Sequence, residues 1–200
     1  MTDTDLGHAL PLPVASAELE DRLARRRSAP AQALTVPGPT QDQIARILEL
    51  GARTPDHGKL FPWRFVVLGP TSRATLATAL APLAQAQPQP DKARAVLGKL
   101  TAAPVTILVV STPVHSQKVP VWEQQLSAGA VCMNLEHAAG ALGFSTSWIT
   151  DWYSYDAEAL ALLSLTKGEQ VAGFIHIGTL AEPPFERPRP DLSAKVEYRD

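Results

Sequence analysis

The chain has 200 residues, of which 45% are hydrophobic and 19% charged, with a formal net charge of -2 and a pI near 6.2. This balance is typical of a globular protein that buries a sizeable core in one domain. The slightly acidic charge argues against a general nucleic-acid binder, and no apolar run approaches the roughly 18 residues that span a bilayer. We see no pattern of a secretory signal. The single cysteine, Cys132, fits a reducing compartment, so we expect a cytoplasmic protein.

The beginning of the chain predicts a leader followed by two helices. Residues 1–16 carry no core pattern and are expected to form a flexible leader. Apolar spacing predicts a short helix over residues 17–27, which ends in three adjacent arginines. Thr40 and Gln43 have the spacing of a capping box, which predicts a second helix over residues 40–53.

The middle of the chain alternates between strand and helix patterns. The clearest strand is the β-branched run "APVTILVVSTP", which is bracketed by prolines. In chain order, we expect a strand over 64–69, helices over 71–87 and 91–100, and a strand over 103–113.

The last part of the core contains the longest predicted helix, over residues 121–142, with small side chains at 127–130. Two further strands (146–150 and 171–178) and a short helix (156–165) are expected to follow it. Together these elements predict a single layered domain, α/β or α+β, over residues 17–181. The proline-rich segment 182–200 has no core pattern and is expected to be an extended C-terminal arm or disordered.

Standard catalytic and metal-binding motifs do not occur in the sequence. It has no phosphate-binding GxxxxGK[ST] loop, no HExxH, no GxSxG and no spaced Cys/His set, so we expect no bound metal. Cys132 lies among apolar neighbours and is expected to be an inert buried thiol. Glu136, His137 and His176 are expected to be ordinary polar or hydrogen-bonded side chains.

Two stretches could carry binding chemistry. At the end of the first helix, Arg26, Arg27 and Ser28 can converge where the chain turns, which would suit a phosphate dianion. An exposed basic helix end is the alternative. The second stretch, "RTPDHGKLFPWRF", places Arg53 and His57 in a loop between a helix and a buried strand, where binding groups often concentrate.

The order and spacing of these stretches resemble the nitroreductase superfamily of FMN-dependent oxidoreductases, and most closely its compact bacterial branch. The resemblance runs from "RRS" through "ARTPDHGKLFPWRFVVL" and "HSQKVPVWEQQLSAGAVCMNLEHAAGALGFSTSWIT" to "VAGFIHIGT". It covers about residues 18–180. It implies an α+β fold with a mixed, mainly antiparallel sheet flanked by helices, and a homodimer with two flavin sites at the interface.

The resemblance also implies site residues. The phosphate and ribityl end of FMN would be held by Arg26, Arg27 and Ser28, and Arg53 and His57 would contact the flavin, in a site shared with the partner subunit. The isoalloxazine would be lined by Trp148, Ile149 and Thr150. NADH or NADPH would meet the segment made of Ala138, Ala139, Gly140, Ala141, Leu142 and Gly143.

The chain departs from the family pattern at three positions. Many relatives have an arginine where this chain has Pro30, so the phosphate is expected to depend on Arg187 or Arg189 of the arm. Lys59 and Phe61 replace the usual asparagine and glutamine, which puts the usual polar contacts to the flavin ring in doubt.

The expected activity is hydride transfer from NAD(P)H to nitroaromatic, quinone or similar small acceptors, with the flavin as carrier and no catalytic residue in the protein. One alternative is a protein of the same fold with a specialised role, such as flavin destruction or dehalogenation. Another is a non-enzymatic module that uses Arg25–Arg27 to bind an acidic partner.

Overall fold

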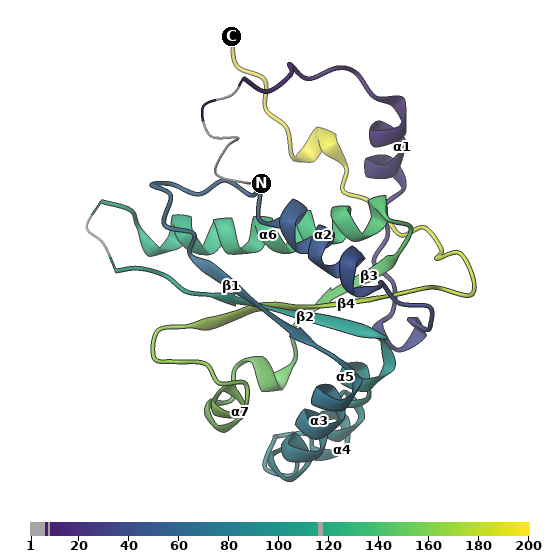
Figure 1. Ribbon diagram of the computed structural model, residues 1–200, viewed down its shortest axis with the longest axis vertical. Helices are drawn as coiled ribbons and strands as arrows, with labels where there is room; N and C mark the ends of the chain where they lie inside the picture. Colours follow the sequence, from purple (N-terminus) through teal and green to yellow (C-terminus); the bar gives the residue numbers. More distant parts are fainter. Residues whose placement is uncertain (1–6, 8, 116–117) are drawn as a thin grey trace.

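A computed structural model describes residues 7, 9–115 and 118–200 (Figure 1). Part of the predicted leader, residues 1–6 and 8, lies outside the described residues. A four-stranded sheet lies between two layers of helices, and α1 and the C-terminal segment stand beside one of these layers. No helix of the described part is long and apolar enough to cross a membrane.

The sheet has the strand order β1-β2-β4-β3, and each neighbouring pair is antiparallel. The strands span Trp63–Leu68 (β1), Val105–Ser111 (β2), Ser145–Ile149 (β3) and Gln170–Gly178 (β4). These observations confirm the α+β class and the mainly antiparallel sheet; the described strands contain no parallel pair, so the expected mixture of directions is not found among them.

Alternating side chains divide the core into two apolar layers. Ile107 and Ile175 point to one face, where they pack with α6 (Val121–Ala141) and α2 (Gln41–Gly51). Leu108 and Phe174, one position away on the same strands, belong to the cluster on the other face. That face is covered by α3 (Pro70–Ala84), α4 (Pro90–Ala95), α5 (Gly98–Ala102) and α7 (Ala157–Leu162) (Figure 1). The two-residue period of the strands therefore builds both cores at once.

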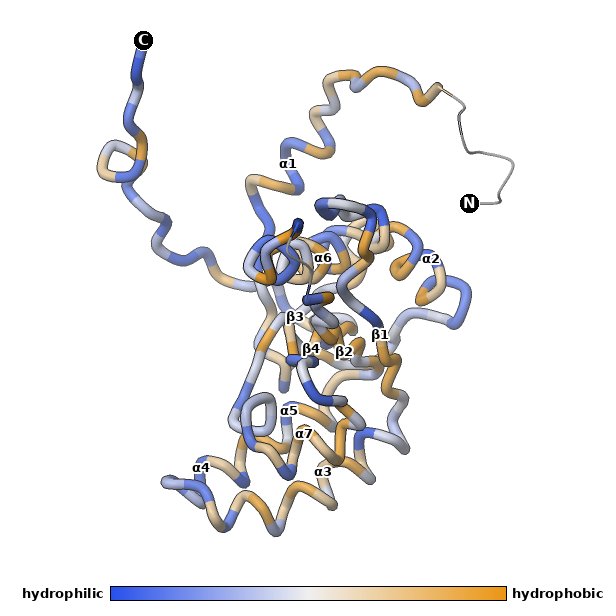
Figure 2. The backbone as a smooth tube through the Cα atoms, turned by 90° about the vertical axis from the view of Figure 1, so that its left-hand side faces the viewer, coloured by the Kyte–Doolittle hydropathy of each residue, from blue (hydrophilic) through white to orange (hydrophobic). Residues whose placement is uncertain are grey.

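In the described part of the chain, three short 3₁₀ helices connect or follow these elements. They are η2 (Ala31–Ala33), η3 (Trp152–Ser154) and η4 (Leu192–Ala194). The helix η4 interrupts the C-terminal arm. The arm and α1 both leave the core on the side of α6, but they extend in different directions (Figure 2). Helix α1 (Ala17–Arg25) buries none of its residues.

The helices predicted over 40–53, 71–87 and 156–165 end earlier than expected, as α2, α3 and α7. Two further differences have a visible cause. The first helix ends at Arg25 because Arg26 has an extended ψ of 130° and the chain then runs to β3, where the amide of Ala29 donates to the carbonyl of Thr146 (2.8 Å). The predicted helix over 91–100 is two helices, α4 and α5. The break precedes Gly98, a residue with poor helix propensity.

A tight contact between β4 and the ring of Trp148 gives a test of the packing. A Cβ atom at Gly173 would overlap the pyrrole part of that ring. We expect Gly173→Ala to lower the free energy of unfolding by about 1–3 kcal/mol, as overpacked cores do. Urea unfolding measures the change. Gly98→Ala is the control, because no atom lies within 4 Å of its added Cβ, and a similar loss in both variants would contradict the packing described.

Candidate functional site

Helix α6 connects the two stretches that the sequence analysis singled out. Near its N-terminal end Glu123 contacts His57 of the α2–β1 loop. Near its C-terminal end Glu136 lies beside Arg26. At a rise of about 1.5 Å per residue, these two glutamates are about 20 Å apart along the helix axis. Arg26 and His57 therefore lie near opposite ends of one helix.

The α2–β1 loop is tied to α6 by side-chain hydrogen bonds. The hydroxyl of Ser127 donates to the carbonyl of Pro55 (2.9 Å) and accepts from the indole N–H of Trp63 (3.2 Å). About two helical turns after Ser127, the side-chain amide of Asn134 donates to the hydroxyl of Thr54 (2.7 Å). The loop is thus fixed to the helix at several points along one helix face.

The loop also stabilises its own bend. The carboxylate of Asp56 accepts hydrogen bonds from the backbone N–H groups of Leu60 (2.6 Å) and Phe61 (3.4 Å). Lys59 (φ 56°) and Phe61 (φ 48°) adopt the left-handed conformation, which is costly for residues other than glycine. Phe61 is 61% exposed. Two of the three positions that depart from the family pattern, Lys59 and Phe61, are therefore held in strained backbone at the surface.

His57 lies against a cavity of about 380 Å³ beside α6. Its Nδ1 is 2.8 Å from a carboxylate oxygen of Glu123, which lines the same cavity. The sequence analysis missed Glu123, Asp56 and Asn134. The separation of Glu123 and Ser127 by four residues could have indicated the helix face that meets the loop.

The predicted phosphate residues lie around two neighbouring cavities. Arg26 and Arg27 line a cavity of about 290 Å³ between α1 and the C-terminal end of α6. Ser28 and Arg27 line a second one, of about 400 Å³, against the arm. Arg27 thus belongs to both, whereas Arg26 and Ser28 face different cavities.

The two arginines have different partners. A nitrogen of Arg26 is 3.9 Å from the carboxylate of Glu136, which is buried and accepts from the hydroxyl of Thr146 (2.9 Å). The same nitrogen, Nη1, is buried and makes no hydrogen bond. Arg27 donates from Nε to the carbonyl of Phe185 in the arm (2.8 Å). The buried and unsatisfied donor on Arg26 can serve an anion.

The arm brings one of its two arginines to this cluster. Arg189 donates to the backbone carbonyl of Arg26 (3.2 Å) and pairs with Glu186 (3.0 Å). Arg187 is exposed, and its backbone N–H donates to the Glu186 carboxylate (2.7 Å). Of the two arm arginines considered in the sequence analysis, Arg189 is therefore the one seen in contact with the arginine cluster.

The predicted isoalloxazine segment is divided between environments. Trp148 packs in the α6-side core, and its indole N–H donates to the carbonyl of Ala172 (3.1 Å). Ile149 follows it directly in β3, so its side chain points to the opposite face of the sheet. Thr150 accepts a hydrogen bond from the hydroxyl of Tyr155 (2.9 Å). A ligand on the α6 face could contact the side chain of Trp148 but not that of Ile149.

The predicted nicotinamide segment covers the end of α6 and the turn after it. Ala138 and Ala139 are buried in the core, so their side chains are closed to a ligand. The partly or fully exposed members are Gly140, Ala141, Leu142 and Gly143. The carbonyl of Gly140 accepts from Arg22, and Gly143 has a φ of 87°, which ends the helix in a left-handed turn.

Cys132 and His176 are buried outside the two stretches. Burial raises the pKa of Cys132 to about 12, so the thiol stays protonated, as expected. Burial also lowers the pKa of His176 to about 4, and its Nδ1 is 2.8 Å from the hydroxyl of Thr106. His176 is therefore the neutral, hydrogen-bonded strand residue that was predicted. Within the described residues, no three His, Cys, Asp or Glu side chains are grouped so as to hold a metal ion.

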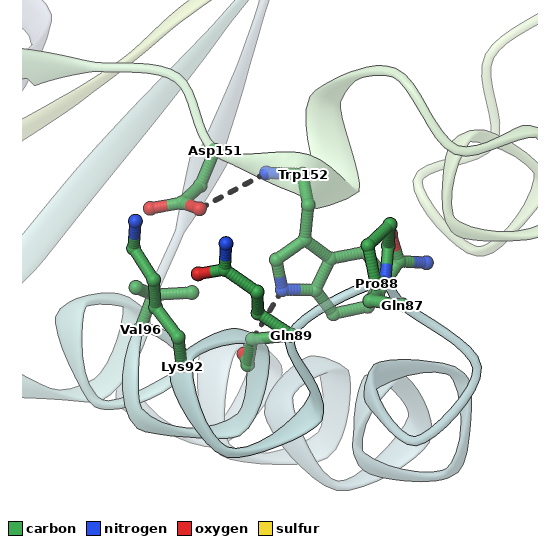
Figure 3. A pocket seen from close by; sticks show the side chains of 8 residues that line it. Gln87, Pro88, Gln89, Lys92, Val96, Asp151 and Trp152 are labelled. Carbon is green, nitrogen blue, oxygen red and sulfur yellow. Dashed lines mark hydrogen bonds between the residues drawn. The ribbon is translucent and has the colours of Figure 1, made fainter.

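A further cavity, of about 250 Å³, lies between α4 and η3 (Figure 3). Its carboxylate, Asp151, accepts from the backbone N–H of Trp152 (3.0 Å) and from Lys99 (2.9 Å). The indole N–H of Trp152 donates to the carbonyl of Ala93 (2.9 Å). These groups are already paired, and none of the predicted site residues lines this cavity.

Comparisons with known proteins agree with the fold and with the extent of the resemblance. Residues 23–179 match the sequence pattern described as "Nitroreductase family". The chain is 34% identical over 158 residues to the Escherichia coli (strain K12) protein named "Putative NAD(P)H nitroreductase YdjA", covering 78% of this chain and 85% of that protein.

Two solved structures share the fold. One is a nitroreductase-like family protein from Bacillus cereus, with a TM-score of 0.80 at 20% identity over 96% of this chain and 99% of that one. The other is a nitroreductase with bound FMN from Bacteroides fragilis NCTC 9343, with a TM-score of 0.71 at 20% identity over 93% of this chain and 100% of that one.

Proposed function

We propose that this chain, which belongs to the nitroreductase family, is an FMN-dependent oxidoreductase. It would take hydride from NADH or NADPH and pass it to a nitroaromatic, a quinone or a similar small acceptor. A sequence relative is named as an NAD(P)H nitroreductase, and one structure of the same fold contains FMN. Bound FMN would supply the redox chemistry, because a flavin can accept a hydride and return it.

The observation that carries the proposal concerns Arg26, which lines the cavity between α1 and α6: its buried Nη1 makes no hydrogen bond, although the Glu136 carboxylate is 3.9 Å away. An unsatisfied buried donor is costly unless a ligand pairs with it. A phosphate oxygen is a suitable partner for a guanidinium group. Arg26 would therefore hold the phosphate end of FMN, with Arg27, Ser28 and Arg189 beside it.

The protein's part in the reaction is to bind, orient and shield the flavin. The α2–β1 loop would present Arg53 and His57 to the ring, and its ties to Ser127 and Asn134 keep that loop in place. Because these hydrogen bonds already hold the loop against α6, we expect little conformational entropy to be lost when a ligand docks. No protein nucleophile is required for hydride transfer.

The separation of the two proposed ligand-binding regions supports our proposal of a homodimer with shared sites. Arg26 and His57 contact opposite ends of α6, so one chain places them far apart. A second copy could bring its loop to the arginine cluster of the first. Large apolar side chains that remain exposed on the α6 side would be covered by the same contact. They are Leu19, Leu23, Phe61, Trp122, Leu126, Phe185, Val196 and Tyr198.

Reduction kinetics test the proposed activity. We expect NADH or NADPH to bleach the bound flavin without oxygen, and a nitroaromatic or a quinone to restore its colour. Steady-state rates should give parallel double-reciprocal lines, because one open flavin face must release the first product before the acceptor docks. Bleaching without reoxidation by these acceptors would instead favour a specialised role for the same fold.

A comparison of variants at two neighbouring arginines distinguishes a specific phosphate contact from a general effect of positive charge. We expect Arg26→Ala to weaken FMN binding by about tenfold to a hundredfold, since a hydrogen bond to a charged group contributes roughly 1.5–3 kcal/mol. Arg25→Ala should change it little, because Arg25 is exposed and paired with Asp21 (2.6 Å). Titration of flavin fluorescence measures both affinities.

A folding control is needed beside this titration, because Arg26 also faces the buried Glu136. Thermal unfolding of the flavin-free variants shows how much of the lost FMN affinity comes from a less stable protein. Equal losses of affinity in the Arg25 and Arg26 variants would contradict a specific phosphate contact.

Mixed dimers test the sharing of sites. We expect an Arg26→Ala chain and a His57→Ala chain, each severely impaired alone, to recover activity when combined. A dimer of the two has one site with both lesions and one intact site. Light scattering gives the mass of the flavin-loaded protein. A flavin-loaded monomer, or folded variants that recover no activity in a verified mixed dimer, would contradict the shared site.

A further inference from the structure

Glu123 of α6 holds the ring of His57 at a defined nitrogen. A carboxylate oxygen of Glu123 is 2.8 Å from Nδ1 of His57. An ionised carboxylate only accepts hydrogen bonds, so Nδ1 carries the hydrogen in this contact. The other ring nitrogen, Nε2, is then left to meet a second partner.

The scaffold around this pair distinguishes it from an ordinary surface ion pair. Exposed pairs contribute little when two long side chains must be ordered to form them. Here the backbone of the loop is already fixed to the same helix through Ser127 and Asn134. The adjacent Asp56 carboxylate is engaged with the backbone of Leu60 and Phe61. Glu123 and His57 therefore face each other from positions that the fold has set.

We propose that Glu123 is a positioning residue, which keeps the hydrogen of neutral His57 on Nδ1 and thereby presents Nε2 to the flavin as a hydrogen-bond acceptor. The part that concerns the flavin rests on the proposed function. The part that concerns the ring does not, because the contact exists within this chain alone.

Nuclear magnetic resonance tests the ring directly. In the purified full-length chain with ¹⁵N-labelled histidine, long-range proton–nitrogen spectra at alkaline pH report which nitrogen of neutral His57 carries the hydrogen. We expect Nδ1–H in the unchanged chain and a shift of the population to Nε2–H in Glu123→Ala. Glu123→Gln should retain most of the Nδ1–H form, because its amide oxygen can still accept. If the fraction of His57 that carries the hydrogen on Nδ1 is the same in the unchanged chain and in Glu123→Ala, the proposal is overturned.

Flavin affinity tests the consequence. We expect Glu123→Ala to weaken FMN binding by about three- to tenfold, and Glu123→Gln to restore most of it. In a His57→Ala background, Glu123→Ala should cause no further loss, because the carboxylate acts through the ring. Glu158→Ala, which removes an exposed carboxylate from α7 on the other side of the sheet, should leave the affinity unchanged.

The two measurements fail in different ways. A chain that binds no FMN contradicts the proposed function, while the NMR spectra still decide whether Glu123 sets the ring. If Glu123→Ala moves the His57 hydrogen from Nδ1 to Nε2 but leaves FMN affinity unchanged, the positioning role toward the flavin is overturned. If Glu123→Ala weakens FMN binding as much in the His57→Ala background as in the unchanged chain, Glu123 does not act through the His57 ring, and the positioning role is overturned as well.

Discussion

The packing of α6 against the sheet sets the geometry on which the rest of the site depends. The helix is buried through small and apolar side chains such as Ala128, Val131 and Leu135, so it cannot shift without opening the α6-side core. Its polar residues then act as fixed reference points. Glu123 and Ser127 meet the α2–β1 loop, and Glu136 meets Arg26. Helix α6 therefore determines where the two proposed binding regions lie.

The fold was largely accessible from the sequence because its signals are local. Strand residues such as Ile107 and Leu108 form a strongly β-branched or apolar run, and the capping box at Thr40 is present as predicted. One error occurs where a distant contact overrides local preference. The end of α1 depends on the bond between Ala29 and Thr146, which no sequence period contains. The strand order likewise depends on pairings between segments far apart in the chain.

For the candidate site, the sequence could predict which residues are involved but not how they are arranged. Family resemblance pointed to Arg26, Arg27 and His57, but the pairs that orient them join residues more than 60 positions apart, as with His57 and Glu123. Periodicity also could not show that Ala138 and Ala139 face the core while Gly140 reaches the surface, because α6 is apolar around most of its circumference. The link between Arg27 and Phe185 depends on how the arm folds back, and a proline-rich segment gives no signal of that.

The unsatisfied Arg26 donor and the α2–β1 loop tied to α6 support our proposal that the chain binds an anionic, planar cofactor. The absorption spectrum of the protein as purified, followed by mass spectrometry of what heat releases, tests this claim most directly. We expect a yellow protein whose absorption bands lie close to those of free FMN. On heating, this protein should release FMN rather than FAD. A protein that stays colourless after incubation with FMN, or one that releases FAD, would contradict it.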